Sequence, residues 1–418
     1  MILPPAELAL TTIGSTSDDL LAELAAFREF DQATIRNEIT RPGQPPVPVF
    51  VNEFWTSKQR AAHPLHEVSY RACFKPQLPR FFIERLTRPG DLVYDPFMGR
   101  GTTLVEGALL GRRVAGCDVN PLSRVFASPR LDPPVIEAVA DRLGSLDFSW
   151  DKAVREDLHV FYHHSTLRQI TALRHYLLGR IRTGKADGVD QWIQMVATNR
   201  LTGHSPGFFS VYTLPPNQAV SIESQKRINA KRGQKPEKRD VPALILKKTR
   251  QLLAAGSFPQ VSGLRSQVSS ILTQSCDTTP QLANDSVDLI VTSPPFLDTV
   301  DYAQDNWLRS WFCGIDPNTV SIWHLRNLAD WTSAMTRTFR ELHRVLSPGG
   351  HIAFEVGEVR NGKIRLDEQV LAAGCAAGLK PVLLLINSQG FTKTANCWGV
   401  SNNTKGTNTN RVVLFQKT

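Results

Sequence analysis

The feature that most constrains the fold is a strand, a glycine-rich turn, a helix and a second strand within residues 91–118. A short apolar strand at 91–94 runs into the turn DPFMGRGTT (95–103), the helix LVEGALLG follows, and the strand RVAGCD ends at Asp118. This order predicts a βαβ unit of a nucleotide-binding sheet. An acid at the end of the second strand is placed to accept both ribose hydroxyls of an adenosine-containing ligand.

The turn excludes two common kinds of nucleotide site. A Walker A motif needs a lysine before its Ser/Thr, and Arg100-Gly101-Thr102-Thr103 has none. The dinucleotide fingerprint needs a third glycine three residues after the second, and this glycine is missing. Gly99 and Gly101 still let the backbone approach a ligand closely, and the helix from Thr102 directs its N–H groups toward that ligand.

A proline-locked loop, Ser293-Pro294-Pro295-Phe296, follows a buried strand at 287–291. Two consecutive prolines fix the backbone and remove two N–H donors, so the local carbonyls stay free to accept hydrogen bonds. Ser293 Oγ and the Pro294 carbonyl can together hold the two protons of an amino group, while Phe296 offers a flat apolar face. The loop indicates a pocket for the exocyclic amine of a flipped base. The alternative is a Pro-Pro turn with a phenylalanine in the core.

The positive charge of the chain is concentrated in one segment. The chain has 48 Lys and Arg against 39 Asp and Glu, a net charge of +9. Residues 224–250 hold ten basic and two acidic residues, and therefore carry +8 of that charge. Such a local footprint is typical of an arm that contacts phosphates, and a solvated loop and helix face is the alternative.

Composition excludes several other classes of protein. The six cysteines form no CxxC pair, which rules out a zinc ribbon or a redox motif. The histidine pairs at 63/66 and 163/164 lack cysteine or acidic companions at ligand spacing, so we expect no metal. No charged region precedes an apolar run as in a secretory signal, and no apolar stretch approaches the roughly 18–20 residues of a membrane span. Sparse thiols suit a reducing cytosol, so we expect a cytoplasmic protein with no membrane partner.

Two motifs resemble those of the DNA amino-methyltransferases, which methylate N4 of cytosine or N6 of adenine. DPFMGRGTT (95–103) resembles their motif I (DPFxGxGTT), and TSPPF (292–296) resembles their motif IV. The resemblance covers 66–130 and 270–418, roughly half of the chain. Four weaker pieces are in consistent order: HEVSYRACFKPQLPRFFIERL (66–86) for motif X, GCDVNP (116–121) for motif II, SCDTTP (275–280) for motif III, and VLSPGGHIAF (345–354) for the strand after motif IV.

The resemblance implies an α/β fold with a Rossmann-like class I methyltransferase sheet, mostly parallel with an antiparallel last strand, and an inserted, largely helical target recognition region. We expect an N-terminal extension and linker at 1–60, where 41–49 contains four prolines. Residues 61–130 and 270–418 would form the S-adenosylmethionine-dependent catalytic domain. Residues 131–269, with the basic segment 224–250, would form the target recognition region.

The spacing of the motifs supports the insertion. About 175 residues separate Asp118 from Ser293, whereas a plain βαβα path needs about 60–70 given usual element lengths. Helical patterns at 136–146, 167–183 and 191–201 lie within the extra length, as does the basic segment. In the family that the motifs resemble, an insertion at this place is the target recognition region of the α class, which favours a DNA-facing role for the basic segment.

The resemblance assigns residues to three roles by their position in the motifs. S-adenosylmethionine would be the cofactor. Residues expected at the cofactor are Phe74, Lys75, Leu78, Asp95, Phe97, Gly99, Gly101, Thr102, Asp118 and Asp277 or its neighbours. The target base would be held by Ser293, Pro294, Pro295 and Phe296. The DNA-binding residues would be Lys226, Arg227, Lys231, Arg232, Lys235, Lys238 and Arg239.

The implied reaction is direct in-line methyl transfer to N4 of a flipped cytosine in double-stranded DNA. Within the family, serine at the first position of motif IV is commoner among N4-cytosine enzymes, and Asp or Asn among N6-adenine enzymes. An N6-adenine enzyme, an RNA methyltransferase and a DNA-binding protein with a decayed cofactor site remain alternatives. Cytosine C5 methylation needs a cysteine after a proline, and none of the six cysteines follows one. A cognate restriction endonuclease that acts separately, as in restriction–modification, and an association with the nucleoid of a prokaryote or phage-infected cell are further expectations.

Overall fold

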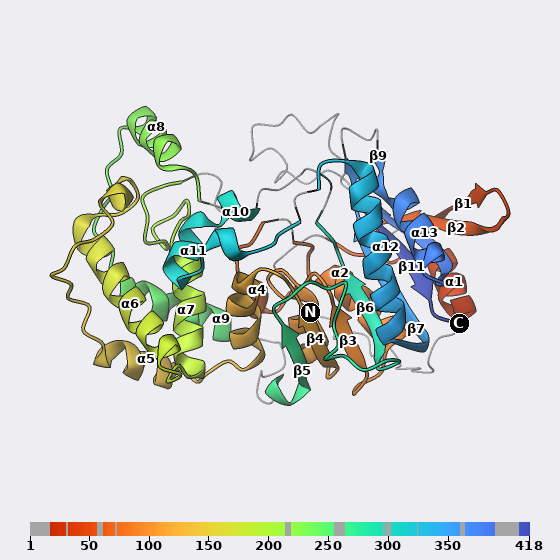
Figure 1. Cartoon of the computed structure of the whole chain (residues 1–418), viewed down its shortest axis with the longest axis horizontal. Helices are drawn as coiled ribbons and strands as arrows, with labels where there is room; N and C mark the ends of the chain where they lie inside the picture. Colours follow the sequence, from red (N-terminus) through yellow and green to blue (C-terminus); the bar gives the residue numbers. More distant parts are fainter. Residues whose placement is uncertain are drawn as a thin grey trace, which may run out of the picture.

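The computed structural model describes residues 17–30, 32–56, 62–71, 73–213, 219–254, 264–295, 297, 302–323, 325–359, 364–388 and 409–418. A nine-stranded sheet forms its centre, in the order β1-β2-β10-β11-β7-β6-β3-β4-β5 (Figure 1). The strands of this sheet are β1 (Ile35–Arg41), β2 (Gln44–Asn52), β3 (Leu92–Asp95), β4 (Arg113–Cys117), β5 (Val268–Leu272), β6 (Val287–Thr292), β7 (Leu346–Val356), β10 (Lys380–Ser388) and β11 (Thr409–Gln416). β8 (Glu358–Val359) and β9 (Ile364–Arg365) form a separate antiparallel pair.

The pairing of the strands confirms the expected fold class. β5, β4, β3, β6 and β7 pair with one another in parallel, whereas β11 is antiparallel to both β7 and β10. β11, the last strand in the chain, therefore lies between two strands that precede it. Because β3, β4 and β6 are parallel, their carboxyl ends meet at one edge of the sheet, which is where ligands bind in open α/β folds.

The proline-rich stretch 41–49, expected to be a linker, lies mostly in strand β2. β2 pairs in parallel with β10 and antiparallel with β1, so this hairpin extends the sheet. The residues that pair with β10 begin at Val49, after the prolines at 45, 46 and 48, which face only β1. Proline cannot donate to a strand ladder, and here the doubly paired part of the strand contains none. A sequence reading by proline content alone could not find this strand.

Helices cover both faces of the sheet. The helices are α1 (Ser17–Ala26), α2 (Gln77–Leu86), α3 (Thr102–Leu109), α4 (Pro121–Ala127), α5 (Ile136–Ser145), α6 (His164–Arg182), α7 (Gly188–Arg200), α8 (Ile222–Arg232), α9 (Val241–Leu253), α10 (Tyr302–Asp305), α11 (Trp307–Cys313), α12 (Leu328–Val345) and α13 (Leu366–Ala376). On one face α12 and α13 pack on the sheet, as Phe339 does on Phe354. On the other face, Leu24 of α1 and Phe82 of α2 are buried in one cluster with Ala353, the residue before Phe354 in β7. Successive residues of β7 thus enter different cores, as the alternation of a strand requires.

The helices α5 to α9, which we call the helical insertion (residues 136–213 and 219–253), lie together beyond the β5 edge, opposite the β1 edge (Figure 1). Their core is continuous with that under α3 and α4: Trp192 of α7 belongs to the same buried cluster as Val105 and Phe126. The indole of Trp192 also donates a 3.0 Å hydrogen bond to Thr249 of α9. The insertion is therefore held to the sheet by a shared apolar core. Within the described chain, no helix has the length and apolar character to cross a membrane.

Candidate functional site

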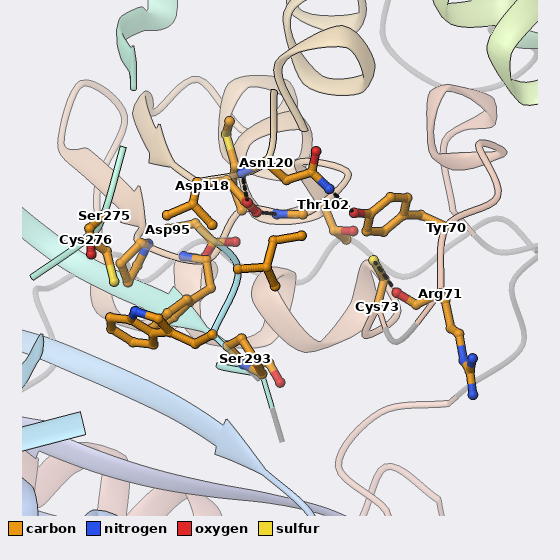
Figure 2. Close-up of a pocket in the computed structure, with 18 of the residues that line it drawn as sticks. Tyr70, Arg71, Cys73, Asp95, Thr102, Asp118, Asn120, Ser275, Cys276 and Ser293 are labelled. Atoms are coloured by element: carbon orange, nitrogen blue, oxygen red, sulfur yellow. Dashed lines mark hydrogen bonds between the residues drawn. The ribbon is translucent and has the colours of Figure 1, made fainter. Parts of the chain in front are cut away.

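A pocket of about 810 Å³ lies at the edge where the carboxyl ends of β3, β4 and β6 meet. Asp95 ends β3, Asp118 follows β4 and Ser293 follows β6, and all three line the pocket (Figure 2). Figure 2 shows Ser275 and Cys276 at the end of the pocket opposite Tyr70 and Arg71. Of the residues that the sequence assigns to the cofactor or the base, those that line the pocket are Phe74, Asp95, Phe97, Gly99, Thr102, Asp118, Ser293 and Pro295.

The glycine-rich turn uses its two glycines differently. Both have positive φ angles, +49° at Gly99 and +77° at Gly101, which other residues adopt only with strain. Gly99 lines the pocket. Gly101 instead faces the end of α4, where an added Cβ would lie 2.7 Å from the Cβ of Ala127. Gly99 thus suits close approach of a ligand, and Gly101 suits close packing behind the turn.

Asp118 is fixed by the backbone around it. One carboxylate oxygen accepts the N–H of Gly99 at 2.9 Å, and the other accepts the N–H of Asn120 at 2.9 Å. Burial raises the pKa of this carboxyl, and the two hydrogen bonds oppose the rise. Because a carboxylate oxygen can accept more than one hydrogen bond, Asp118 retains acceptor capacity for hydroxyl groups in the pocket.

Asp95 connects the glycine-rich turn to the proline-locked loop. Its Oδ1 accepts the hydroxyl of Thr292 at 2.6 Å and the N–H of Phe97 at 3.0 Å. Burial raises the pKa of Asp95 to about 7, with a further contribution from the negative charge of Asp118, while the hydrogen bonds oppose the rise. A carboxyl of this pKa changes its charge near neutral pH, and a positive group in the pocket would favour its ionised form.

Arg100 anchors one wall of the pocket, a role that the sequence did not reveal. We call residues 62–71 and 73–74 the strap. The buried guanidinium of Arg100 donates to the strap carbonyls of His66 at 3.3 Å, Val68 at 2.7 Å and Phe74 at 3.4 Å. Its Nε also donates to Thr102 in the turn at 3.1 Å. The strap supplies Tyr70, Arg71, Cys73 and Phe74 to the pocket.

The helical insertion and α11 also hold the strap. Asn199 of α7 and Arg309 of α11 both donate to the carbonyl of Ser69, each at 3.2 Å. Lys248 of α9 pairs with Glu67 at 3.0 Å, and the Lys248 ammonium is nearly buried. The wall of the pocket is therefore in direct contact with the insertion, through bonds that depend on its helices being in place.

Glu355, at the carboxyl end of β7, is a second residue that the motifs did not reveal. The side chain of Ser293 lies near the buried carboxyl of Glu355 and lowers the pKa of that carboxyl as a hydrogen-bond partner. Asn410 of β11 donates a further hydrogen bond to Glu355 at 3.1 Å. Burial raises the pKa of Glu355, and these two hydrogen bonds oppose the rise. The sequence marks Glu355 only weakly, because this residue lies in an otherwise apolar strand and belongs to none of the motifs.

The remaining part of the proline-locked loop is held from α12. The indole N–H of Trp331 donates to the carbonyl of Pro295 at 2.9 Å. Pro294 is buried and is not among the residues that line the pocket. Phe296, assigned to the target base, lies outside the described residues.

Besides Gly101, three residues expected at the cofactor do not line the pocket. Leu78 is fully buried in the core between α2 and the sheet, because it lies on the apolar face of its helix. Lys75 is partly buried, and burial lowers the pKa of its ammonium, with the positive charge of Arg100 as a second cause. Asp277 turns toward α12, where it pairs with Arg337 at 3.3 Å. Its neighbours Gln274, Ser275 and Cys276 line the pocket instead.

An aromatic side chain from a stretch without any motif completes the pocket. Trp323, in the segment between α11 and α12, lines the pocket together with Ile322. Its ring lies edge-on to that of Phe97, with 6.0 Å between the ring centroids. No spacing or composition signal marks this segment, so only the folded chain identifies Trp323.

The residues expected to bind DNA lie on α8 of the helical insertion and in the segment that follows α8. Lys226, Arg227, Lys231 and Arg232 are exposed on α8, at the outer end of the insertion in Figure 1. The opposite side of α8 is fastened by Asn229, which donates to the carbonyl of Val160 at 2.7 Å. α8 therefore presents these four cationic side chains to solvent. After α8, Lys235 and Lys238 are exposed, while Arg239 is partly buried and pairs with Glu237 at 3.0 Å.

Within the described residues, no group of three or more His, Cys, Asp and Glu side chains could hold a metal ion. The histidine pairs have other contacts. His63 and His163 accept backbone N–H groups at the starts of a 3-10 helix and of α6. Burial lowers the pKa of His66 to about 4, although the hydrogen bond to Glu106 opposes this.

Parts of the chain are similar to known DNA methylases and other methyltransferases. Residues 27–123 match the family model for N6/N4 DNA methylases. The type II methyltransferase M.MvaI of Kocuria varians is 35% identical over 111 residues, 26% of this chain and 23% of that protein. The tRNA (guanine(10)-N2)-dimethyltransferase of Methanocaldococcus jannaschii is 35% identical over 95 residues, 19% of this chain and 27% of that protein. Further type II methyltransferases match over 10% to 64% of this chain.

Solved structures also match. One is a protein described as a DNA modification methylase of Thermus thermophilus, in complex with S-adenosyl-L-methionine, with a TM-score of 0.20, 20% identity and coverage of 32% of this chain and 49% of that one. Each match covers less than two thirds of the curated relative's own length. The family model over residues 27–123, the type II methyltransferase relatives and the two motifs thus make the chain similar, over part of its length, to the DNA methylases of the N6/N4 family.

Proposed function

We propose that the protein transfers a methyl group from S-adenosylmethionine to the exocyclic N4 of a flipped cytosine in double-stranded DNA. The observation that carries this proposal is the pocket, where two carboxylates of the glycine-rich half adjoin the Ser293–Glu355 pair of the proline-locked half. A cofactor site and an amine-binding hydroxyl at one strand edge are what direct methyl transfer requires, because both reactants must be held in contact.

The chemistry of the pocket fits this cofactor. Burial raises the pKa of both Asp95 and Asp118, so a ligand that brings positive charge and hydroxyl groups would stabilise their ionised forms. Asp118 would accept the ribose hydroxyls, and the turn around Gly99 would hold the methionine end. Gln274, Ser275 and Cys276 would line the adenine end. When bound, the cofactor supplies an electrophilic methyl group on a positively charged sulfur.

Ser293 and Glu355 would act on the target amine. Ser293 lines the pocket near Glu355, so its hydroxyl could donate its proton to that carboxylate while its oxygen accepts an N–H of the amine. Accepting that hydrogen bond increases the electron density on the amine nitrogen as it attacks the methyl carbon. The nitrogen must then release one proton. It can pass to Ser293 Oγ while the serine proton passes to Glu355.

The choice of cytosine N4 rests on Ser293, since serine at this position is commoner in the N4-cytosine enzymes of the family. N6 of adenine in the same pocket is the alternative within the family. RNA is a second candidate substrate, because one relative named above is a tRNA dimethyltransferase. The proposal includes a cognate restriction endonuclease that acts separately, because several relatives are type II methyltransferases. It also includes a cytoplasmic, nucleoid-associated location, which a DNA substrate would require.

The first prediction concerns the product. We expect mixed-sequence duplex DNA, incubated with the protein and S-adenosylmethionine, to yield N4-methylcytosine on mass spectrometry of its nucleosides. The Ser293→Ala variant, which loses the hydroxyl but keeps the prolines, should bind cofactor and yield far less product. N6-methyladenine as the product would overturn the choice of base and keep the reaction. Product on transfer RNA with none on DNA would overturn DNA as the substrate.

The second prediction concerns pH and cofactor binding. The pKa of Asp95 is about 7, so about a tenth of the protein has this carboxylate ionised at pH 6 and about nine tenths at pH 8. A positively charged ligand prefers the ionised form, so its affinity should rise about tenfold between these pH values. Calorimetric titration with S-adenosylmethionine measures this. Asp95→Asn should bind more weakly at pH 8 and lose most of the pH dependence, whereas an unchanged profile in this variant would contradict the assignment.

The third prediction separates the chemical role of Glu355 from its structural role. Glu355→Gln keeps the size of the side chain but removes the proton acceptor, and we expect kcat to fall by about 10²-fold or more. The cofactor Kd and the melting temperature should change little. Asn410→Ala is the matched control, because it removes the other hydrogen bond to Glu355 and leaves the Ser293 contact. Equal losses of kcat in the two variants would mean that Glu355 only supports the fold.

The fourth prediction concerns the basic segment. Neutralising Lys226, Arg227, Lys231 and Arg232 together should weaken DNA binding and flatten the slope of log K against log salt by up to about 3 to 4 units, since each phosphate contact contributes about 0.9. A control variant neutralises four exposed basic residues on the catalytic sheet and its helices: Arg88, Arg113, Arg340 and Lys380. Arg113 and Lys380 begin strands, so they lie at the edge opposite the pocket. Equal slopes in both variants would contradict a role of α8 in phosphate binding.

A further inference from the structure

A second hollow adjoins the pocket. It is an open groove of about 990 Å³, which we call the flanking groove, between residues 219–224 at the start of α8, Arg155, and the segment from Gln304 to Trp307. Asp305 lines this groove, and Arg71 of the strap lines the pocket. The two side chains form an ion pair, with 2.5 Å between Arg71 Nη1 and Asp305 Oδ2. The Arg71–Asp305 ion pair therefore connects the wall of the pocket to the wall of the flanking groove.

The two sides of the flanking groove are fixed to each other. The N–H of Ala219 donates to the carbonyl of Asp305 at 3.1 Å, and the indole N–H of Trp307 donates to the carbonyl of Val220 at 3.3 Å. These bonds join the start of α8 to the chain that follows the proline-locked loop. The lining side chains thus keep a defined spacing relative to the pocket, as a surface that reads a partner must.

The chemistry of the flanking groove differs from that of the outer face of α8. The guanidinium of Arg155 lies over the ring of Trp307, 5.1 Å from its centroid, and pairs with Asp157 at 2.8 Å, which gives the groove a flat face with a fixed guanidinium. Glu223 and Gln304 are exposed at its rim and offer a carboxylate and an amide. Donors and acceptors are therefore mixed here. On α8 the four exposed side chains that the sequence assigns to DNA are all cationic.

This mixture suits the edges of bases better than phosphates. Phosphate oxygens only accept hydrogen bonds and carry negative charge, so carboxylates such as Glu223 and Asp305 would repel them. Base edges in the major groove present donors and acceptors in patterns that differ for each base pair, and carboxylates and amides are among the side chains that read them. A carboxylate accepts from the amino group of cytosine, and an amide can pair with adenine.

We propose that the flanking groove reads the base pairs next to the target base, while the outer face of α8 holds the DNA backbone. This inference rests on the proposed function, because it takes the base in the pocket to come from DNA. The flanking groove is joined to the pocket wall by the Arg71–Asp305 pair and includes the first residues of α8, so it is placed to meet the DNA between the pocket and the outer face of α8. Sequence specificity and affinity would thus come from separate parts of the same insertion.

The test compares sequence preference among variants of the full chain. Duplexes with one target cytosine and randomised flanking base pairs are methylated by each protein, and the methylated molecules are sequenced. Glu223→Gln and Gln304→Ala change exposed side chains, so both should fold and bind S-adenosylmethionine like the wild type. Each should shift the kcat/KM ratio between flanking sequences by about 5- to 100-fold at one or two positions. Lys231→Ala, on α8 outside the flanking groove, should lower kcat/KM for all sequences alike.

The outcomes separate this inference from the proposed function. Wild-type methylation with the same flanking preference in both groove variants would overturn the inference and leave the proposed function intact. Equal methylation of all flanking sequences by the wild type would do the same. A wild type that binds S-adenosylmethionine but methylates no DNA would overturn the proposed function, and the inference with it.

Discussion

The architecture of the site depends on one buried guanidinium. Arg100 extends from the glycine-rich turn into the strap, where it donates to three backbone carbonyls of a largely irregular segment. A buried charge is tolerable only when hydrogen bonds surround it, so the strap and the turn must form together. The strap in turn contributes four residues to the pocket, and the insertion contacts it at Ser69 and Glu67. The cofactor end of the pocket, the turn and the insertion therefore make one connected unit.

A few long-range contacts likewise fix the proline-locked loop at the other end of the pocket. Thr292 donates to Asp95, Ser293 lies near Glu355, and the carbonyl of Pro295 accepts from Trp331. Residues of one short loop are thus fixed by β3, β7 and α12. A hydroxyl placed in this way keeps its orientation without the substrate, which is the preorganisation that electrostatic catalysis needs. The motif in the sequence identifies the loop, but the side chains that orient it come from elements far away in the chain.

The sequence predicted the features that depend on local patterns and missed those that depend on contacts between distant segments. The βαβ unit, the strand that ends in SPPF, and the class of the sheet depend on local patterns and on the family motifs, and the structure confirms that fold class. Glu355, near Ser293, and Trp323, in the pocket wall, were missed because nothing local marks a site residue within an apolar strand or an irregular segment. Leu78 and Asp277 were assigned to the cofactor by motif position, yet their side chains turn to the core and to Arg337. β2 was expected to be a linker because of its prolines. Its pairing with β10, which begins after those prolines, is a long-range contact that the sequence does not show.

The place of β2 in the sheet has a consequence for how the chain is made. Residues 49–52 pair with residues 384–387, so this side of the sheet closes between segments more than 330 residues apart. At the usual synthesis rate of about 5–20 residues per second, roughly 20–70 s pass on the ribosome between the two. During that time the β1–β2 hairpin has an open edge and its apolar side chains lack their cover. The hairpin is thus the part of the catalytic sheet most exposed to nascent-chain aggregation and to chaperones, and its long-range pairing makes it a late step of folding.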